Sequence, residues 1–152
     1  MKIGLISDTH DNLPLIKKAV EFFNSKNIEL VLHAGDFIAP FSIRPFEELN
    51  CPWRGVFGNN DGEREGLSKI SQGRIVEPPL FLEFDSKKIA LTHKFIDLEA
   101  DVIVSGHTHI SKVEKRDSTL IVNPGEASGW LYGKATVGIL DTRTVSVEFF
   151  PL

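Results

Sequence analysis

The feature that most constrains this chain is a set of five polar segments, each placed at or just beyond the end of a short apolar run. The first run, Ile3-Gly4-Leu5-Ile6, leads directly into Ser7 and Asp8. Such runs are typical of strands buried on both faces of a sheet. Open α/β sheets bind ligands beyond the carboxyl ends of their strands, so the pattern predicts one shared site. The five segments are Asp8-Thr9-His10, Gly35-Asp36, Gly58-Asn59-Asn60-Asp61, Thr92-His93 and Gly106-His107-Thr108-His109.

Apolar spacing predicts alternating strands and helices in the first half of the chain and short strands in the second. Helical spacing from Leu15 to Phe23 indicates a helix over 13–25, with Pro14 in its first turn. Further helices are expected near 41–49 and 62–70, and strands near 30–32 and 53–57. The second half predicts strands over 80–84, 87–92, 102–105, 112–115, 119–122, 136–140 and 144–149, with hairpin turns at 85–86 and 141–143. The sum is an α/β layered domain with a mixed sheet.

Composition narrows the class of protein. The 152 residues suffice for a single domain, 1–152, with a core of its own. A net charge of −4 lacks the basic footprint of a nucleic-acid binder, so nucleic acid is not an expected partner. Cys51 is the only cysteine, which excludes an intrachain disulfide and fits a reducing compartment. No apolar run approaches the roughly 20 residues that span a bilayer, and the first is too short for a signal peptide. We therefore expect a cytoplasmic protein without a membrane partner.

The polar segments supply a mixed set of carboxylate, amide and imidazole side chains, which suits divalent Mn, Fe, Ni, Co or Zn. The absence of cysteine among them argues against a closed structural zinc site. Seven ligands exceed what one ion with an open position needs, and they suit two ions about 3.5–4 Å apart that share a carboxylate. In an extended segment, residues two apart lie on one face, as Asp8 and His10 would. The candidate ligands are Asp8, His10, Asp36, Asn59, His93, His107 and His109.

A simpler interpretation exists for each motif alone, because an isolated Asp-x-His or His-x-His is more often a surface turn. Four of the five histidines fall in these segments, however, and every segment follows a predicted strand. This joint arrangement favours a metal site. The fifth histidine, His33, ends a predicted strand, and we expect it to be packed or to support the ligands rather than to bind metal.

The ordered motifs resemble the calcineurin-like metallophosphoesterase family over nearly the whole chain. Asn123-Pro124-Gly125 resembles the small subgroup that contains prokaryotic phosphodiesterases and the retromer scaffold subunit. The resemblance implies a four-layer αββα sandwich with two mixed β-sheets. It also implies hydrolysis of a phosphate ester by a hydroxide that bridges two divalent metal ions.

The resemblance also assigns residues. It gives Asp8, His10, Asp36 and His109 to the first metal. It gives Asp36, Asn59, His93 and His107 to the second, with Asp36 as the bridge. Asp36, Asn60 and Asp61 are the predicted catalytic residues. We expect Mn²⁺ or Ni²⁺ as the ions, with Fe, Co and Zn as alternatives.

The sequence departs from the family pattern in two places. Much of the family carries a histidine, credited with protonating the leaving group, where this chain has Asn60, and an amide is no general acid. We therefore expect a preference for diesters or good leaving groups. The second departure is the link of nine residues, 93–101, where relatives tend to have a helix. A parallel crossover normally needs about 10–12 residues or more, so a truncated loop with at most one helical turn is predicted. The cleft would be more open there, or completed by a second subunit.

Other side chains receive structural interpretations. Asn12 is expected to cap the helix that starts at Leu13 rather than to touch substrate. Lys94 is expected to be a solvated surface residue rather than to reach the phosphate. For Arg64, contact with a substrate phosphate and a surface role remain open. Trp53 and Trp130 are expected to be packing residues. A place in the core, rather than on a partner surface, is expected for Phe37, Ile38, Phe41 and Phe46.

The leading hypothesis is a metal-dependent phosphodiesterase that acts on a small phosphodiester. A homodimer or higher homo-oligomer is compatible with this hypothesis. The alternative is a protein-binding scaffold of the same fold with little or no catalysis. A scaffold can lose ligand histidines without losing the fold, yet this chain keeps every candidate. A nuclease or nucleotide phosphatase ranks lower, because no basic groove is evident. Small nucleotide substrates stay open.

Overall fold

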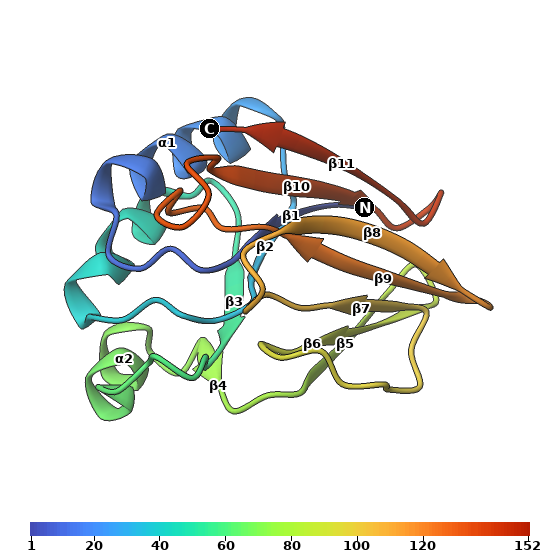
Figure 1. Ribbon diagram of the computed structural model, residues 1–152, viewed down its shortest axis with the longest axis horizontal. Coiled ribbons are helices and arrows are strands. Elements are labelled where there is room, and N and C mark those ends of the chain that lie inside the picture. The colour runs from blue at the N-terminus through green and yellow to red at the C-terminus, as the bar shows by residue number, and fades with distance from the viewer.

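Eleven strands form two mixed sheets in the computed structural model, which describes residues 1–152 (Figure 1). The six-stranded sheet contains β1 (Lys2–Ile6), β2 (Leu30–His33), β3 (Trp53–Val56), β4 (Ile75–Val76), β10 (Thr136–Asp141) and β11 (Ser146–Pro151). The five-stranded sheet contains β5 (Leu80–Phe84), β6 (Lys87–Leu91), β7 (Val102–Val104), β8 (Ser111–Arg116) and β9 (Thr119–Pro124). The spatial orders are β11-β10-β1-β2-β3-β4 and β5-β6-β7-β9-β8. The predicted α/β class with two mixed sheets is confirmed.

Each sheet has a parallel centre, and this is what gathers the polar segments. β1, β2, β3 and β4 run parallel, with Ile6 opposite His33 and His33 opposite Gly55. β6, β7 and β9 also run parallel, with Leu91 opposite Val104. Parallel strands in register end at the same edge, so the segments that follow them emerge side by side.

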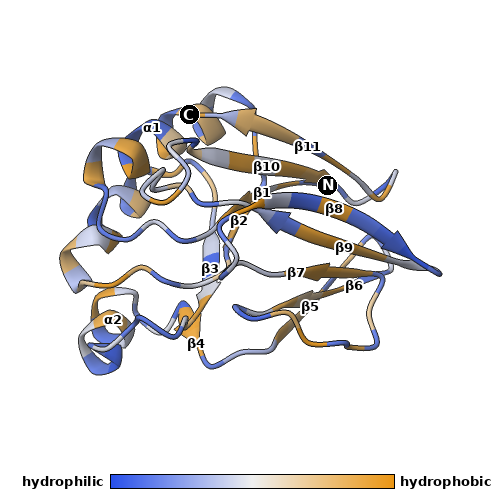
Figure 2. Ribbon diagram, in the orientation of Figure 1, coloured by the Kyte–Doolittle hydropathy of each residue, from blue (hydrophilic) through white to orange (hydrophobic).

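Two apolar cores hold the layers together. Between the sheets lie side chains such as Leu5, Leu32 and Val104, all fully buried. On the other face of the six-stranded sheet, Val20 and Phe23 of α1 (Leu13–Ser25) help to form a second core. Full burial of such side chains stabilises by about 1.5–3 kcal/mol each. Figure 2 shows the same contrast along the chain, with β7 and β10 largely hydrophobic and β8 largely hydrophilic.

The helices match the sequence predictions with small differences. α1 spans the predicted range, whereas α2 (Arg64–Ile70) begins two residues later than expected. The segment η1 (Pro40–Glu48) is a 3₁₀ helix that contains Pro45, which lacks the N–H that a continuous α-helix requires. The short strand β4 was not predicted, because two residues are too few for a periodicity. The first hairpin turn lies at Asp85 and Ser86 as expected, and the second is longer, since β11 begins only at Ser146.

No helix follows α2, so all helices lie in the first 70 residues (Figure 1). The link between β6 and β7 is an irregular loop without a helical turn, which confirms the predicted truncation. The resemblance implies a second helical layer, and this chain has only that loop in its place. None of the helices is long and apolar enough to cross a membrane.

The aromatic predictions are confirmed in part. Phe37, Phe46 and Trp53 are buried in the core. The expectation of packing was wrong for Phe41 and Trp130, which are 47% and 64% exposed. Phe41 is the second residue of the 3₁₀ helix and faces outward, while Trp130 belongs to a loop after β9. Ile38 is only half-buried.

Candidate metal centre

The candidate ligands all lie in loops at one edge of the two sheets. Asp8, Asp36, Asn59, His93 and His107 follow β1, β2, β3, β6 and β7 by two or three residues. The strand ends therefore place every segment as the sequence predicted. Each loop has only a few residues in which to turn its side chains toward a common point.

Left-handed backbone conformations make these turns. The φ angles of Asp8, Asp36 and His107 are 52°, 62° and 67°, and His10 and His109 have φ of 39° and 64°. A non-glycine residue with positive φ is uncommon and costs of order 1–3 kcal/mol, so it persists only where the surrounding structure imposes it. The expectation that Asp8 and His10 converge along an extended segment was wrong. They converge through left-handed turns instead.

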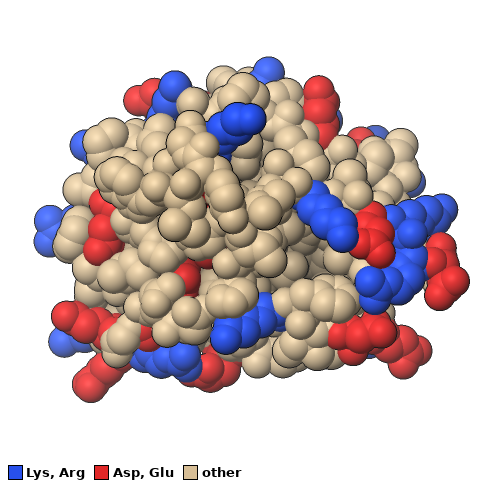
Figure 3. All heavy atoms as spheres, viewed as in Figure 1, with Lys and Arg blue, Asp and Glu red and all other residues tan.

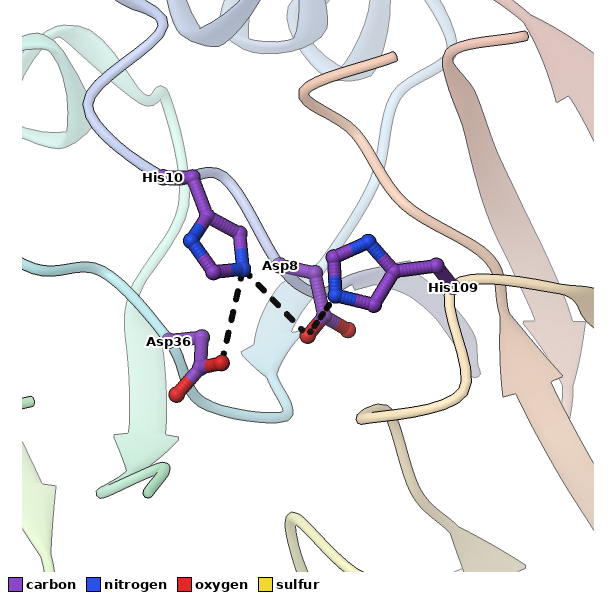
Figure 4. Close-up of side chains that lie close together, drawn as sticks. All are labelled: Asp8, His10, Asp36 and His109. Carbon is purple, nitrogen blue, oxygen red and sulfur yellow. Dashed lines mark ion pairs between the residues drawn. The ribbon is translucent and has the colours of Figure 1, made fainter. Parts of the chain in front are cut away.

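The first group consists of Asp8, His10, Asp36 and His109, whose ligand atoms all lie within 4.8 Å of one another (Figure 4). The Nε2 of His10 is 3.4 Å from Asp36 Oδ2 and 3.8 Å from Asp8 Oδ1. The Nε2 of His109 is 3.3 Å from Asp8 Oδ1. Asp8 Oδ1 and His10 Nε2 are buried and have no hydrogen-bond partner. Buried polar atoms without partners are costly, and a cation among them would satisfy both.

The second group lies on the other side of Asp36. The Nε2 of His93 is 3.5 Å from Asp36 Oδ1 and 2.9 Å from Asn59 Oδ1. The His107 ring lies edge-on to His93, with centroids 5.2 Å apart. The two oxygens of Asp36 thus face different histidines, which is the arrangement that a carboxylate shared between two cations requires.

Electrostatics in the first group are dominated by the buried carboxylates. Burial lowers the pKa of His10, but the neighbouring carboxylates of Asp36 and Asp8 outweigh this effect and raise that pKa to about 9. For Asp36, burial raises the pKa, and the contacts with His10 and Asn60 more than reverse this, leaving it well below its usual range. The pKa of His107 is lowered by burial and by the neighbouring His93. The centre is therefore rich in negative charge that a cation would neutralise.

Asp61 does not face the metal groups. Its carboxylate is buried and accepts hydrogen bonds from the backbone N–H groups of Asp36, Ile38 and Gly58, at 3.0, 2.8 and 2.7 Å. Burial raises the pKa of Asp61, and these bonds oppose the rise. The geometry gives Asp61 a positioning role, because it ties the loop of Asp36 to the loop of Asn59.

Replacing Asp61 with Ala is expected to lower the free energy of unfolding by about 3 kcal/mol or more. Two buried N–H groups and one partly buried N–H group would lose their acceptor, at about 1–3 kcal/mol for each buried group. Urea unfolding of the metal-free protein measures this change. Asp97→Ala, in an exposed loop, is the matched control and should leave stability unchanged. Equal stability of the two variants would contradict the positioning role.

No sequence pattern pointed to Glu126 as part of the site. This carboxylate is fully buried and lies 2.8 Å from Nδ1 of His109. A carboxylate on the second ring nitrogen of a histidine orients the ring and raises its basicity as a ligand. The predicted Asn123 motif has a similar structural role, since its amide donates to the carbonyl of Gly106 and to Thr108 Oγ1. Both residues brace the loop that carries His107 and His109.

The structure also shows the contacts of the other residues that the sequence analysis considered. His33 is buried, stacks on Phe37 with centroids 3.6 Å apart and contacts Thr9, so it is packed. The helix-cap prediction for Asn12 was wrong, because its amide donates to the carbonyl of Ser128 instead. Lys94 is exposed.

Arg64 and Asn60 lie beside the loop of Asn59. Arg64 forms an ion pair with Glu77, and its guanidinium donates to the carbonyls of Asp61 and Gly58. It therefore braces that loop. The Asn60 amide donates to Asp36 Oδ2 at 2.7 Å, which places it next to the shared carboxylate.

Comparison with known proteins identifies the family. Residues 1–145 match the model of the calcineurin-like phosphoesterase superfamily domain. The phosphodiesterase MJ0936 of Methanocaldococcus jannaschii is 44% identical over 156 residues, which cover 94% of each chain. A solved archaeal phosphodiesterase superimposes with a TM-score of 0.93 at 41% identity over all of both chains. Vps29 of Chaetomium thermophilum shares the fold, with a TM-score of 0.72 at 15% identity over 100% of this chain and 93% of its own. The chain therefore belongs to the calcineurin-like phosphoesterase superfamily.

Proposed function

We propose that this protein is a metal-dependent phosphodiesterase that hydrolyses a small phosphodiester at a centre of two divalent ions. The observation that carries the proposal is the position of Asp36, whose two oxygens face His10 on one side and His93 on the other. The similarity of the chain to MJ0936, a phosphodiesterase, supports the same reaction class.

The side chains divide into two sets around that carboxylate. Asp8, His10 and His109 would hold the first ion, and Asn59, His93 and His107 the second. Once bound, a pair of divalent ions lowers the pKa of a water molecule, orients the phosphate and offsets its developing charge. Mn²⁺ and Ni²⁺ are the proposed ions, since borderline imidazole and hard carboxylate ligands suit both.

The protein's own contribution is to hold these ligands rigidly. Asp61 fixes the backbone of Asp36, and Glu126 fixes the His109 ring. Oδ2 of Asp8 accepts a hydrogen bond from the backbone N–H of His107 at 3.1 Å, which leaves Oδ1 for the ion. Preorganised ligands need no rearrangement during the reaction, which is the main source of electrostatic catalysis.

The direct experiment measures bound metal and activity together. The chelator-treated protein should not hydrolyse an aryl phosphodiester such as bis(p-nitrophenyl) phosphate, and added Mn²⁺ or Ni²⁺ should restore the reaction. His107→Ala should prevent restoration. Activity that is unaffected by the chelator, or equal in this variant, would contradict the proposal. Metal binding without any hydrolysis of mono- or diesters would favour the alternative, a scaffold of this fold.

The amide of Asn60 determines how the rate of hydrolysis should depend on the leaving group. Asn60 can donate a hydrogen bond to a phosphate oxygen but cannot protonate a leaving group. Asn60→His should therefore raise kcat for esters with poor, alkyl leaving groups by about 10²-fold, the lower end of general acid catalysis. It should change p-nitrophenyl esters little. A series of substrates with graded leaving-group pKa checks this, and an unchanged slope would contradict the account.

Metal binding should also stabilise the fold. The protein with Mn²⁺ at a hundred times its dissociation constant should gain about 2.7 kcal/mol in free energy of unfolding for each independent site. A thermal melt with and without chelator measures the gain. Asp8→Asn is the matched variant, because it weakens the first site and keeps the size of the side chain. An identical melt with and without metal would contradict the assignment.

A further inference from the structure

The loop after β9 lies against the first metal group and carries three consecutive exposed apolar side chains. Trp130, Leu131 and Tyr132 are 64%, 66% and 56% exposed. The indole Nε1 of Trp130 donates to the carbonyl of His10 at 3.1 Å. Adjacent large apolar side chains left in contact with solvent beside a functional site indicate a binding surface.

Glu126 anchors this loop to the metal centre. Its buried carboxylate accepts hydrogen bonds from the backbone N–H groups of Leu131 at 3.0 Å and Tyr132 at 2.7 Å. The same carboxylate contacts Nδ1 of His109. One buried group thus fixes both a metal ligand and the exposed loop, so the loop has a defined position relative to the reacting phosphate.

A pocket of about 420 Å³ opens beside this loop, lined by His109, Ile110, Ser111, Tyr132, Lys134 and Thr136. This volume is in the range of small-molecule sites, about 300–1,000 Å³. His109 belongs both to the pocket lining and to the first metal group, so the pocket adjoins the metal group. Figure 3 shows a mostly uncharged surface on this face, around a recess whose floor contains acidic atoms.

The lining has two kinds of recognition chemistry. The Tyr132 ring offers a flat face on which an aromatic ring can stack. Lys87 and Lys112 are the only lysines paired with a carboxylate, so the ammonium of Lys134, like those of the other lysines, is free to meet an anion. An aromatic ring joined to a phosphate satisfies both side chains.

From this geometry we infer, building on the proposed function, that the pocket binds the ester group that stays on the phosphate and that this group is a nucleoside. The base stacks on Tyr132, and the ammonium of Lys134 faces the nucleotide phosphate. The preferred substrates are then small esters of nucleotides. A polynucleotide would require a basic groove, and the charge of −4 offers none.

Two substrates that differ only in the retained group test the inference. Thymidine 5′-(p-nitrophenyl) phosphate and methyl p-nitrophenyl phosphate share their leaving group and reacting phosphate. The wild type with Mn²⁺ should favour the nucleotide ester by about tenfold in kcat/KM, the factor expected for one stacking contact. Tyr132→Ala should remove this preference through KM. Tyr132→Phe, which keeps the ring, and Leu131→Ala, in the same loop outside the pocket lining, should retain it.

Binding of the product separates this inference from the proposed function. Thymidine 5′-monophosphate should bind the Mn²⁺-loaded protein in a calorimeter, and Tyr132→Ala and Lys134→Gln should each weaken it about tenfold. Binding without any hydrolysis would support the pocket and overturn the proposed reaction. Hydrolysis without nucleotide preference, or with a preference that Tyr132→Ala leaves intact, would overturn the pocket. If Tyr132→Ala changed only the oligomeric mass in solution and left nucleotide binding intact, the exposed loop would be a contact between copies of this chain. That result would also overturn the pocket.

Discussion

Replacing Asp36 with Asn is expected to lower kcat/KM for an aryl phosphodiester by about 10³-fold or more. An amide has one oxygen that can bind a cation, and its nitrogen has no free electron pair for a second. The link between the two halves of the centre would be lost, while the side chain keeps its size. Metal analysis should find no more than one tightly bound ion.

The control for this variant is Asp117→Asn, which removes an exposed carboxylate in the turn between β8 and β9, at the opposite end of β9 from the ligand loops. It should retain full activity and both ions. A far-ultraviolet circular dichroism spectrum should show that both variants keep the fold. Full activity in Asp36→Asn would show that the reaction does not pass through this carboxylate.

Gly58→Ala is also expected to have a large effect. A Cβ atom on Gly58 would collide with Oδ1 and the backbone nitrogen of Asp36 and would lie 2.8 Å from its Cγ. Because Asp36 is buried and held by Asp61, it cannot move aside without displacing both loops. Misplacing a reacting group by about 1 Å can cost 10²-fold in rate, and overpacking costs about 1–3 kcal/mol in stability.

Gly62→Ala is a matched control in the same loop. No atom lies within 4 Å of the position that its Cβ would take, and its backbone is not in the left-handed region. Kinetics and thermal melts of the two variants should therefore differ sharply, with Gly62→Ala like the wild type. Equal behaviour of both variants would mean that the close approach of Gly58 to Asp36 is not required.

The strand pattern made much of this site predictable. Apolar runs ending in Asp, Asn or His located β1, β2, β3, β6 and β7, and parallel strands in register then brought those residues to one edge. The left-handed turns at Asp8 and His107 had no such signal, because the residue types there do not demand positive φ. The surrounding tertiary structure imposes these conformations, so a local sequence pattern cannot predict them.

Contacts between segments that are distant in sequence could not be predicted, for a related reason. Glu126 meets His109 across seventeen positions in sequence, and Asn12 meets Ser128 across more than a hundred. A single buried acid or amide looks like any surface residue until the fold closes around it. Trp130 shows the reverse case, since an aromatic side chain that suggests a core is exposed beside the metal centre.

Crystals soaked in Mn²⁺ and examined by anomalous scattering test the central claim most directly. The account predicts two strong peaks about 3.5–4 Å apart with the Asp36 carboxylate between them. One should contact His10 and His109, and the other His93 and His107. A single peak, or ions bound elsewhere with these side chains unliganded, would contradict it.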